Sequence, residues 1–263
     1  MSELRAWSLD GWTGWCGSDD AMARSWLAAS ASGEGRRSRH ARTLQLGEVY
    51  VKRYPAPAGP KALHAWRMGE TLRAAGFAVP VPLLAATHAA EGILVTRDVG
   101  GDDLLAYVAG LRAAPQPTVK RRLLARLGRE VARLHNAGFV HGDLVPSNVR
   151  VVGEGLVWLD HDRSRHSHLL VRFSGRRNLV QLGRFVVPGL STVDRWRVLA
   201  AYAGERGWSA RARQRLGRWL ASKIVARRCR IDHLSAADAT RAGFRAVMRS
   251  GGPFDAGRAG GTP

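Results

Sequence analysis

The chain has 263 residues, of which 45% are hydrophobic and 24% are charged, and its formal net charge is +20. This size suffices for one large domain or two closely joined lobes. No apolar run approaches the roughly 20 residues that span a bilayer, and the acidic residues near the N-terminus do not fit a secretory signal. Cys16 and Cys229 are too far apart in sequence for a metal motif or a disulfide framework, which favours a cytoplasmic location.

The positive charge comes almost entirely from arginine. Only four of the 41 basic residues are lysines, so 37 are arginines. Two explanations remain open at this stage. A GC-rich genome raises arginine and alanine together, whereas an anionic partner would favour a basic surface.

The first third of the chain alternates apolar and polar residues in short segments. Thr43–Leu46 and Glu48–Tyr54 flank Gly47, which predicts a β-hairpin. Asp19 and Asp20 can cap a short helix ending near Ala29. The remaining expected elements here are a helix over 61–75 and strands over 79–85 and 92–96.

The rest of the chain favours helices. Apolar residues recur every three or four positions between Thr118 and Asn136, which predicts a helix with one buried face. Further helices are expected near 179–187, 193–204 and 210–229, with two short strands at 149–152 and 156–159. The sequence thus predicts an α+β fold of one domain, 1–250, with a small strand-rich N-lobe (1–97) containing one main helix, a reduced helical C-lobe (98–250), and a disordered tail at 251–263.

A polar loop with candidate catalytic residues follows the long helix. It reads His141-Gly-Asp-Leu-Val-Pro-Ser-Asn148, with Asp143 and Asn148 five positions apart. A carboxylate there can orient a hydroxyl group and accept its proton, and an amide oxygen can bind Mg²⁺ without adding charge. The alternative is a surface turn that contains these residue types by chance.

Two further segments supply charged groups. The apolar run Leu156–Leu159 ends at Asp160-His-Asp162, and a carboxylate at a strand end is well placed to hold Mg²⁺. Lys52, on the second strand of the hairpin, can neutralise phosphates if Glu70 on the next helix holds it in place. Taken alone, Asp160 could be an ordinary strand-ending turn and Lys52 a solvated strand residue.

In order and spacing, these residues resemble the protein-kinase-like superfamily. The chain departs from ordinary protein kinases because Gly142 replaces the catalytic-loop arginine and His161-Asp162 replaces Phe-Gly after the metal-binding aspartate. Within the superfamily it looks most like the bacterial lipopolysaccharide kinase family, which phosphorylates Kdo or heptose of the inner core. The segments that carry this likeness are Val51–Tyr54, Ala137–Leu144, Leu159–Arg163 and Arg176–Leu179.

The resemblance implies ATP and Mg²⁺ as cofactors and action at the cytoplasmic face of the inner membrane, as a peripheral protein. It implies that Asp143 is the catalytic base, within the motif that His141 opens. The implied nucleotide-binding residues are Lys52, Glu70 and the hinge residues Asp98 and Val99, and the implied metal ligands are Asn148, Asp160 and Asp162.

The segment after Asp160 suggests an anionic acceptor. From Arg163 to Arg184 the chain has six arginines and no acidic residue. Guanidinium groups bind carboxylates and phosphates through two parallel hydrogen bonds, which would suit a Kdo carboxylate or a phosphorylated core sugar. We therefore expect Arg163, Arg176 and Arg177 to bind the acceptor, although an arginine-rich surface or an anionic membrane would explain them too.

Three other functions remain open. The chain could phosphorylate another small alcohol, such as an aminoglycoside or choline, or could be an atypical Ser/Thr protein kinase. A basic, non-enzymatic binding module is a further alternative, but no RNA-binding motif or zinc finger is present, and no nucleic-acid partner is expected.

Overall fold

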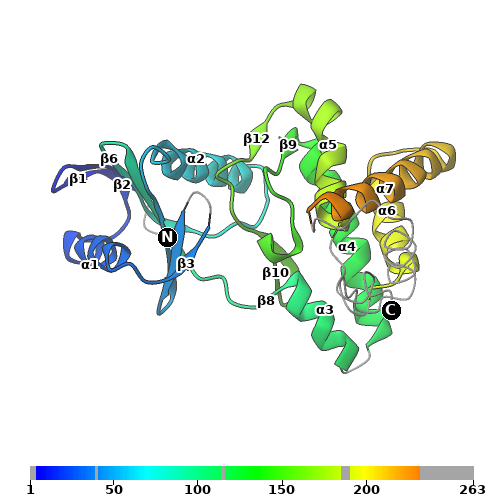
Figure 1. Cartoon of the computed structure of the whole chain (residues 1–263), viewed down its shortest axis with the longest axis horizontal. Coiled ribbons are helices and arrows are strands. Elements are labelled where there is room, and N and C mark those ends of the chain that lie inside the picture. The colour runs from blue at the N-terminus through cyan, green and yellow to red at the C-terminus, as the bar shows by residue number, and fades with distance from the viewer. Residues whose placement is uncertain (1–3, 39–40, 114–115, 185–189, 232–263) are drawn as a thin grey trace, which may run out of the picture. The chain divides into compact units, whose positions relative to one another are not determined.

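The computed structural model describes residues 4–38, 41–113, 116–184 and 190–231. Its elements are labelled in Figure 1. The chain divides into two compact units, which are described separately below. The first consists of Met1–Gly100 and Val157–Ser164, and the second of Gly101–Leu156 and Arg165–Pro263. The strands gather in the first unit and the helices in the second, which confirms the α+β class.

The first unit is built on a seven-stranded sheet in which every neighbouring pair is antiparallel. Its strands are β1 (Arg5–Leu9), β2 (Trp12–Cys16), β3 (Arg36–Arg37), β4 (Arg42–Leu46), β5 (Val49–Tyr54), β6 (Pro82–His88) and β7 (Glu91–Arg97). They are ordered β1-β2-β6-β7-β5-β4-β3 across the sheet. The hairpin predicted around Gly47 is confirmed as β4 and β5, with Leu46 opposite Val49.

The N-terminal residues, which the sequence pattern left unassigned, form the hairpin of β1 and β2. Its two-residue turn is Asp10-Gly11, with φ of 50° and 81°. Positive φ at both central positions is the type I′ geometry, for which Asp-Gly is a preferred pair. Trp7 and Trp12 of this hairpin are buried in the hydrophobic core together with Trp26.

Two helices accompany the sheet, the short helix and the main helix that the sequence predicts. In α1 (Asp20–Ala31), the side chain of Asp19 accepts the Met22 N–H at 2.8 Å, as the predicted N-cap should. The second helix, α2 (Pro60–Ala74), begins with proline, whose missing N–H would have no partner in the first turn.

The second unit contains five helices among the described residues, with short strands between them. The helices are α3 (Leu104–Ala113), α4 (Pro117–Asn136), α5 (His168–Gly183), α6 (Thr192–Glu205) and α7 (Ala210–Ile231). The strands are β8 (Asp102–Asp103), β9 (Phe139–Val140), β10 (Val149–Val152) and β12 (Arg165–His166), and η1 (Pro146–Asn148) is a 3₁₀ turn. A further strand, β11 (Gly155–Trp158), begins in this unit and ends in the first.

Helices α4 and α6 pack closely in this unit. The predicted apolar face of α4 is buried, including Leu127 and Val131. Gly128 lies on the same face, and a Cβ atom there would be 2.2 Å from the Val198 carbonyl oxygen of α6. The absence of a side chain at this position therefore allows the two helix backbones to approach each other.

Helix α5 begins eleven residues before the expected 179–187 helix. The Ser167 side chain caps it by accepting the Leu170 N–H. The buried face of α5 consists of Val171, Gly175, Asn178 and Leu179. Because two of these residues are not apolar and arginines lie between them, the segment shows no clear apolar periodicity in the sequence. Residues 185–187 of the expected helix, and the expected disordered tail at 251–263, lie outside the described residues.

Within the described ranges, no helix has both the length and the apolar character that crossing a bilayer requires.

Candidate active site

The loop His141–Asn148 lies between β9 and β10 in the second unit and is folded by its own hydrogen bonds. The Asp143 N–H donates to the His141 Nδ1 at 3.2 Å. The Asn148 side chain donates from Nδ2 to the Asp143 carbonyl at 2.9 Å, and the Asn148 N–H donates to the Val145 carbonyl at 2.9 Å. These contacts bring Asp143 and Asn148, the predicted base and metal ligand, together in one turn.

Two amide side chains on α5 hold this loop from behind. Asn178 accepts the His141 N–H at 3.0 Å and donates to the His141 carbonyl at 2.5 Å. Gln181 accepts the Leu144 N–H at 3.3 Å and donates to the Asp143 carboxylate at 3.4 Å. Asn178 also donates to Gln181 at 2.9 Å, so that the two side chains act as one brace.

A second layer of buried polar groups supports Asn178. The His135 Nε2 is 3.2 Å from the Asn178 Oδ1, and the His135 Nδ1 is 2.9 Å from the Tyr202 hydroxyl. Because Oδ1 can only accept, His135 carries its proton on Nε2, and the Tyr202 hydroxyl donates to Nδ1. Burial lowers the pKa of His135 to about 4 and raises that of Tyr202 to about 12, so both are neutral at pH 7.

Sequence reasoning did not identify Asn178, Gln181, His135 or Tyr202. The available signal was a polar residue on a buried helix face, since Asn178 follows Val171 and Gly175 on that face of α5. His141, predicted as catalytic, is buried with its ring bonded to the Asp143 backbone. That geometry supports the shape of the loop, and a direct chemical role for His141 stays a prediction.

Lys52 and two carboxylates form a cluster in the first unit. The Lys52 Nζ lies 2.6 Å from the Asp160 Oδ1 and 3.4 Å from the Asp162 Oδ2. Burial alone would lower the pKa of Lys52, but Tyr54, Asp160 and Asp162 raise it well above its usual range. Burial raises the pKa of Asp162, and the Lys52 ammonium opposes that shift.

The segment that carries these carboxylates is fixed to the first unit by backbone contacts. The Trp158 N–H donates to the Ala78 carbonyl at 2.9 Å, and the His64 Nε2 donates to the Ser164 carbonyl at 2.8 Å. Asp160 itself has a φ of 62°, in the left-handed region. Such strain in a residue other than glycine concentrates at functional sites, and aspartate tolerates it better than most residues.

The expected ion pair between Lys52 and Glu70 is wrong for this structure. Glu70 is bound by Arg73, one helical turn further along α2, at 2.8 Å. Arg73 also donates to the Pro80 carbonyl at 3.2 Å. Lys52 pairs instead with Asp160 and Asp162, which follow β11.

The two expected hinge residues lie at the end of β7. The Asp98 carboxylate accepts the Gly100 N–H at 2.8 Å and the Gln45 side-chain N–H at 2.9 Å. Val99 is half-buried beside it. Asp98 thus shapes the turn that ends the strand, and nucleotide contacts by Asp98 and Val99 stay predictions.

The arginines expected to bind the acceptor are all exposed. Arg163 belongs to the first unit, whereas Arg176 and Arg177 lie on α5 in the second. The Arg176 guanidinium lies 5.8 Å from the ring centre of Trp219 on α7, a cation–π distance.

The carboxylates of the Lys52 cluster are of the kind that bind Mg²⁺ together with phosphate oxygens. Among the described residues, no group of three or more His, Cys, Asp or Glu side chains could hold a metal ion alone. Mg²⁺, however, is usually bound by one or two carboxylates with phosphate oxygens and water completing its shell. Asp160 and Asp162 supply such carboxylates in the first unit, and the Asn148 amide oxygen supplies a neutral ligand in the second.

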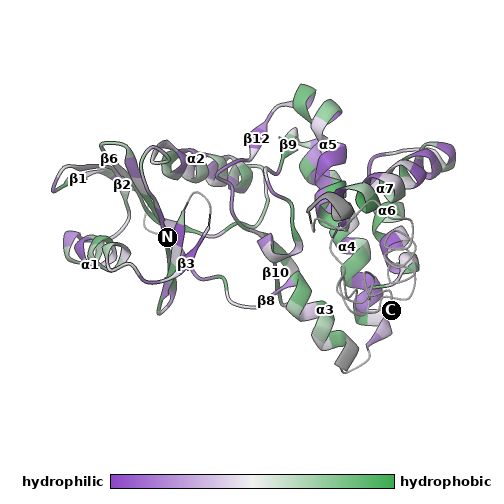
Figure 2. Cartoon of the chain, viewed as in Figure 1, coloured by the Kyte–Doolittle hydropathy of each residue, from purple (hydrophilic) through white to green (hydrophobic). Residues whose placement is uncertain are grey.

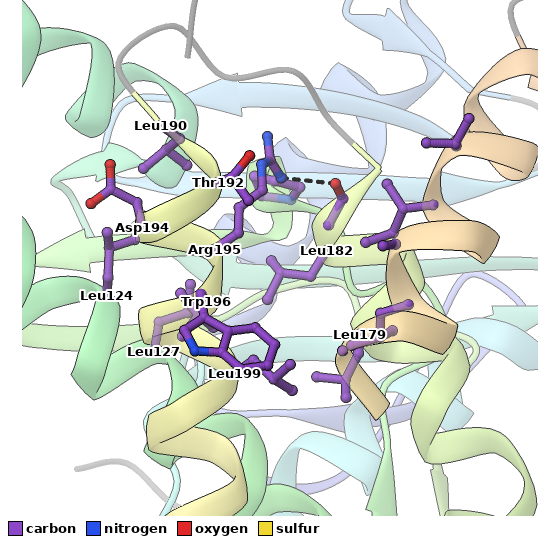
Figure 3. Close-up of a pocket in the computed structure, with 18 of the residues that line it drawn as sticks. Leu124, Leu127, Leu179, Leu182, Leu190, Thr192, Asp194, Arg195, Trp196 and Leu199 are labelled. Atoms are coloured by element: carbon purple, nitrogen blue, oxygen red, sulfur yellow. Dashed lines mark hydrogen bonds between the residues drawn. The ribbon is translucent and has the colours of Figure 1, made fainter. Parts of the chain in front are cut away.

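An apolar cavity of about 500 Å³ also lies among the helices of the second unit (Figure 3). Its walls include Leu127, Leu179 and Leu199, and Arg195 at its edge donates to the Gly183 carbonyl at 2.8 Å. None of the predicted site residues lines this cavity.

Residues 15–202 match the lipopolysaccharide kinase (Kdo/WaaP) family. The chain is also similar to two archaeal proteins, each named a probable bifunctional tRNA threonylcarbamoyladenosine biosynthesis protein. The protein from Methanothermobacter thermautotrophicus is 33% identical over 126 residues, which cover 46% of this chain and 22% of that protein. The protein from Haloquadratum walsbyi is 36% identical over 104 residues, which cover 38% of this chain and 17% of that protein.

The chain thus spans less than a quarter of either archaeal protein. The family match, in contrast, covers well over half of the chain and includes both the His141–Asn148 loop and the Lys52 cluster. Its members are phosphotransferases that act on hydroxyl groups. This protein belongs to the lipopolysaccharide kinase (Kdo/WaaP) family and is a kinase with a hydroxyl group as its acceptor.

Proposed function

We propose that this kinase transfers the γ-phosphate of ATP to a sugar hydroxyl of the lipopolysaccharide inner core, on Kdo or heptose, at the cytoplasmic face of the inner membrane. The match of residues 15–202 to the family carries the proposal. The exposed arginines support an anionic acceptor, because planar guanidinium groups bind carboxylates and phosphates.

In this function, Asp143 orients the acceptor hydroxyl and accepts its proton. Gln181 holds one carboxylate oxygen of Asp143, which leaves the other oxygen for the hydroxyl. Asn148 donates to the Asp143 carbonyl through Nδ2, so that its Oδ1 is left to bind the metal ion. The brace from α5 fixes both groups before the substrate arrives, which preserves their orientation during transfer.

Lys52, Asp160 and Asp162 hold the nucleotide and its metal. ATP supplies the phosphoryl group, and Mg²⁺ neutralises charge on the phosphates. The two carboxylates would hold the metal ion, and Lys52, now paired with them, would supply a positive charge for the phosphates. Arg163, Arg176 and Arg177 bind the acceptor's anionic groups.

The direct test is phosphoryl transfer from labelled ATP to purified Kdo- and heptose-containing core oligosaccharides. The expected product is one added phosphate by mass spectrometry, with loss of about 10²–10⁴-fold in rate for Asp143→Asn. Arg176→Ala/Arg177→Ala should raise the acceptor KM and leave the ATP KM unchanged. Transfer to neither sugar, with intact ATP binding, would contradict the proposed acceptor.

The archaeal relatives provide a second candidate. Their name associates them with tRNA threonylcarbamoyladenosine biosynthesis, and each is more than 30% identical to this chain over the matched residues. A kinase serving that modification would act in tRNA threonylcarbamoyladenosine biosynthesis rather than on a core sugar. A deletion strain separates the two candidates, because one predicts loss of a core phosphate and the other loss of the modified adenosine in tRNA.

A further inference from the structure

Helix α5 has two faces with different chemistry. Successive residues of a helix are rotated by about 100°, so residues at spacings of three, four and seven share a face. Val171, Gly175 and Asn178 form the buried face that holds the catalytic loop. Leu169 and Phe173 lie on the opposite side, one turn apart.

Those two apolar side chains are unusually exposed. Leu169 is 65% exposed and Phe173 is 71% exposed, in contrast to the buried leucines and phenylalanines of the core. The two side chains are adjacent on one helix face, and adjacent exposed apolar groups with a polar rim are a feature of contact surfaces. In Figure 2 the N-terminal turns of α5 carry hydrophobic and hydrophilic residues together.

The surroundings of this pair are positively charged. Arg172, Arg176 and Arg177 are exposed on α5, and Arg165 is exposed on β12 just before it. No acidic residue occurs between Arg163 and Arg184. Apolar side chains bordered by arginines complement an anionic lipid surface, where the apolar groups enter the interface and the arginines contact lipid phosphates.

We propose that the face of α5 formed by Leu169, Phe173 and Arg172 docks on a bilayer containing anionic phospholipid. The helix would then have two roles. Its outer face would contact the lipid surface, and its inner face holds the loop that carries Asp143. This proposal goes beyond the acceptor's identity, because it specifies the surface that brings the enzyme to a membrane.

The experiment is sedimentation of the full chain with vesicles of phosphatidylcholine, with or without about one quarter phosphatidylglycerol. The wild type should bind the anionic vesicles, and salt at about 0.5 M should weaken that binding. Leu169→Ser/Phe173→Ser should reduce the partition coefficient at least about tenfold, because the apolar contribution is lost. Arg172→Gln should reduce it about fivefold, the equivalent of ~1 kcal/mol per basic residue.

Matched controls come from other helices. Val193 on α6 is also 65% exposed, and Arg218 on α7 is exposed, so Val193→Ser and Arg218→Gln should bind like the wild type. All of these changes are at exposed positions, and equal thermal unfolding midpoints would verify intact folding. Equal binding by wild type and Leu169→Ser/Phe173→Ser would overturn the proposal. A second outcome would also overturn it: the wild type does not bind vesicles but forms a dimer, and the double variant is a monomer. The face would then join two copies of the chain.

Discussion

Asn178 binds both backbone polar groups of His141, accepting its N–H at 3.0 Å and donating to its carbonyl at 2.5 Å. This contact fixes the chain two residues before Asp143. Substitutions at this contact, at the Lys52 ion pairs and at the contact between α4 and α6 should change stability, nucleotide binding or transfer rate in the ways given below.

Asn178→Leu should impair both folding and transfer. The change leaves the buried N–H and carbonyl of His141 and the Nε2 proton of His135 without their partner, each at a cost of about 1–3 kcal/mol. We expect kcat to fall at least about tenfold while the ATP KM changes less than twofold, since Lys52 and its carboxylates are in the other unit. Steady-state kinetics and thermal unfolding would measure this. Asn136→Leu, at an exposed position of α4, should leave kcat unchanged and cost only its surface hydrogen bonds to the Glu205 carbonyl and Arg206.

Asp160→Asn should weaken nucleotide binding in the presence of Mg²⁺ by about tenfold. Asparagine tolerates the left-handed backbone, so the substitution removes charge with little new strain. Titration of ATP with and without Mg²⁺ would report the loss. The matched control is Asp10→Asn, another left-handed aspartate (φ 50°) that pairs with an arginine, Arg24. An unchanged Mg²⁺ dependence in Asp160→Asn would place the metal ligands elsewhere.

Double-mutant cycles should distinguish the two possible partners of Lys52. In the nucleotide-free protein, Lys52→Met with Asp160→Asn should give a coupling energy of about 1 kcal/mol, since their atoms are 2.6 Å apart in a partly exposed pair. Lys52→Met with Glu70→Gln should give a coupling near zero, because Glu70 is held by Arg73. Unfolding by urea supplies the free energies. The reverse ranking would restore the pairing expected from the sequence.

Stability should fall between pH 7 and pH 4 through His135. Burial lowers its pKa from 6.5 to about 4, so the unfolded chain binds a proton in this range before the folded chain does. The stability is therefore intact above pH 6.5 and declines as the pH falls toward 4, by on the order of 3 kcal/mol at 1.36 kcal/mol per pH unit. His135→Gln should lose correspondingly less over the same range. Parallel curves for the two proteins would show that His135 takes up its proton as readily in the folded chain as in the unfolded chain.

Gly128→Ala should destabilise the second unit by a few kcal/mol. The added methyl group would lie 2.2 Å from the Val198 carbonyl oxygen, so α4 and α6 would have to separate. Gly110→Ala in α3 is the matched control, because no described atom lies within 4 Å of the new Cβ. There we expect a gain of about 0.5–1 kcal/mol from alanine's higher helix propensity. Comparable unfolding midpoints for the two variants would refute the close-contact argument.

Local patterns predicted the elements that have strong periodicity. The hairpin around Gly47 and the helix ending at Asn136 were recognisable because alternation and the 3–4 spacing directly reflect which face is buried. Helix α5 was placed too late because Asn178 and Gly175 interrupt its apolar face. One of those interruptions, Asn178, holds the His141–Asn148 loop.

Side-chain partners were less predictable than elements. Lys52 and Glu70 occur in the expected order, but Arg73 is one turn from Glu70 along the same helix, and a local partner is available without any long-range arrangement. Similarly, the contact of Asn178 with His141 joins residues 37 positions apart. Sequence spacing alone does not specify such a contact.

The order of the chain restricts how this protein can be dissected. The first unit takes its last eight residues, Val157–Ser164, from the middle of the sequence that otherwise builds the second. A fragment ending at Gly100 would therefore lack Asp160 and Asp162, leaving Lys52 without its counter-charges and the Ala78 carbonyl without the Trp158 N–H. A gene split at Gly100 would separate the two segments of the first unit, and a viable separate first unit would require residues 157–164 to be joined to it through a linker.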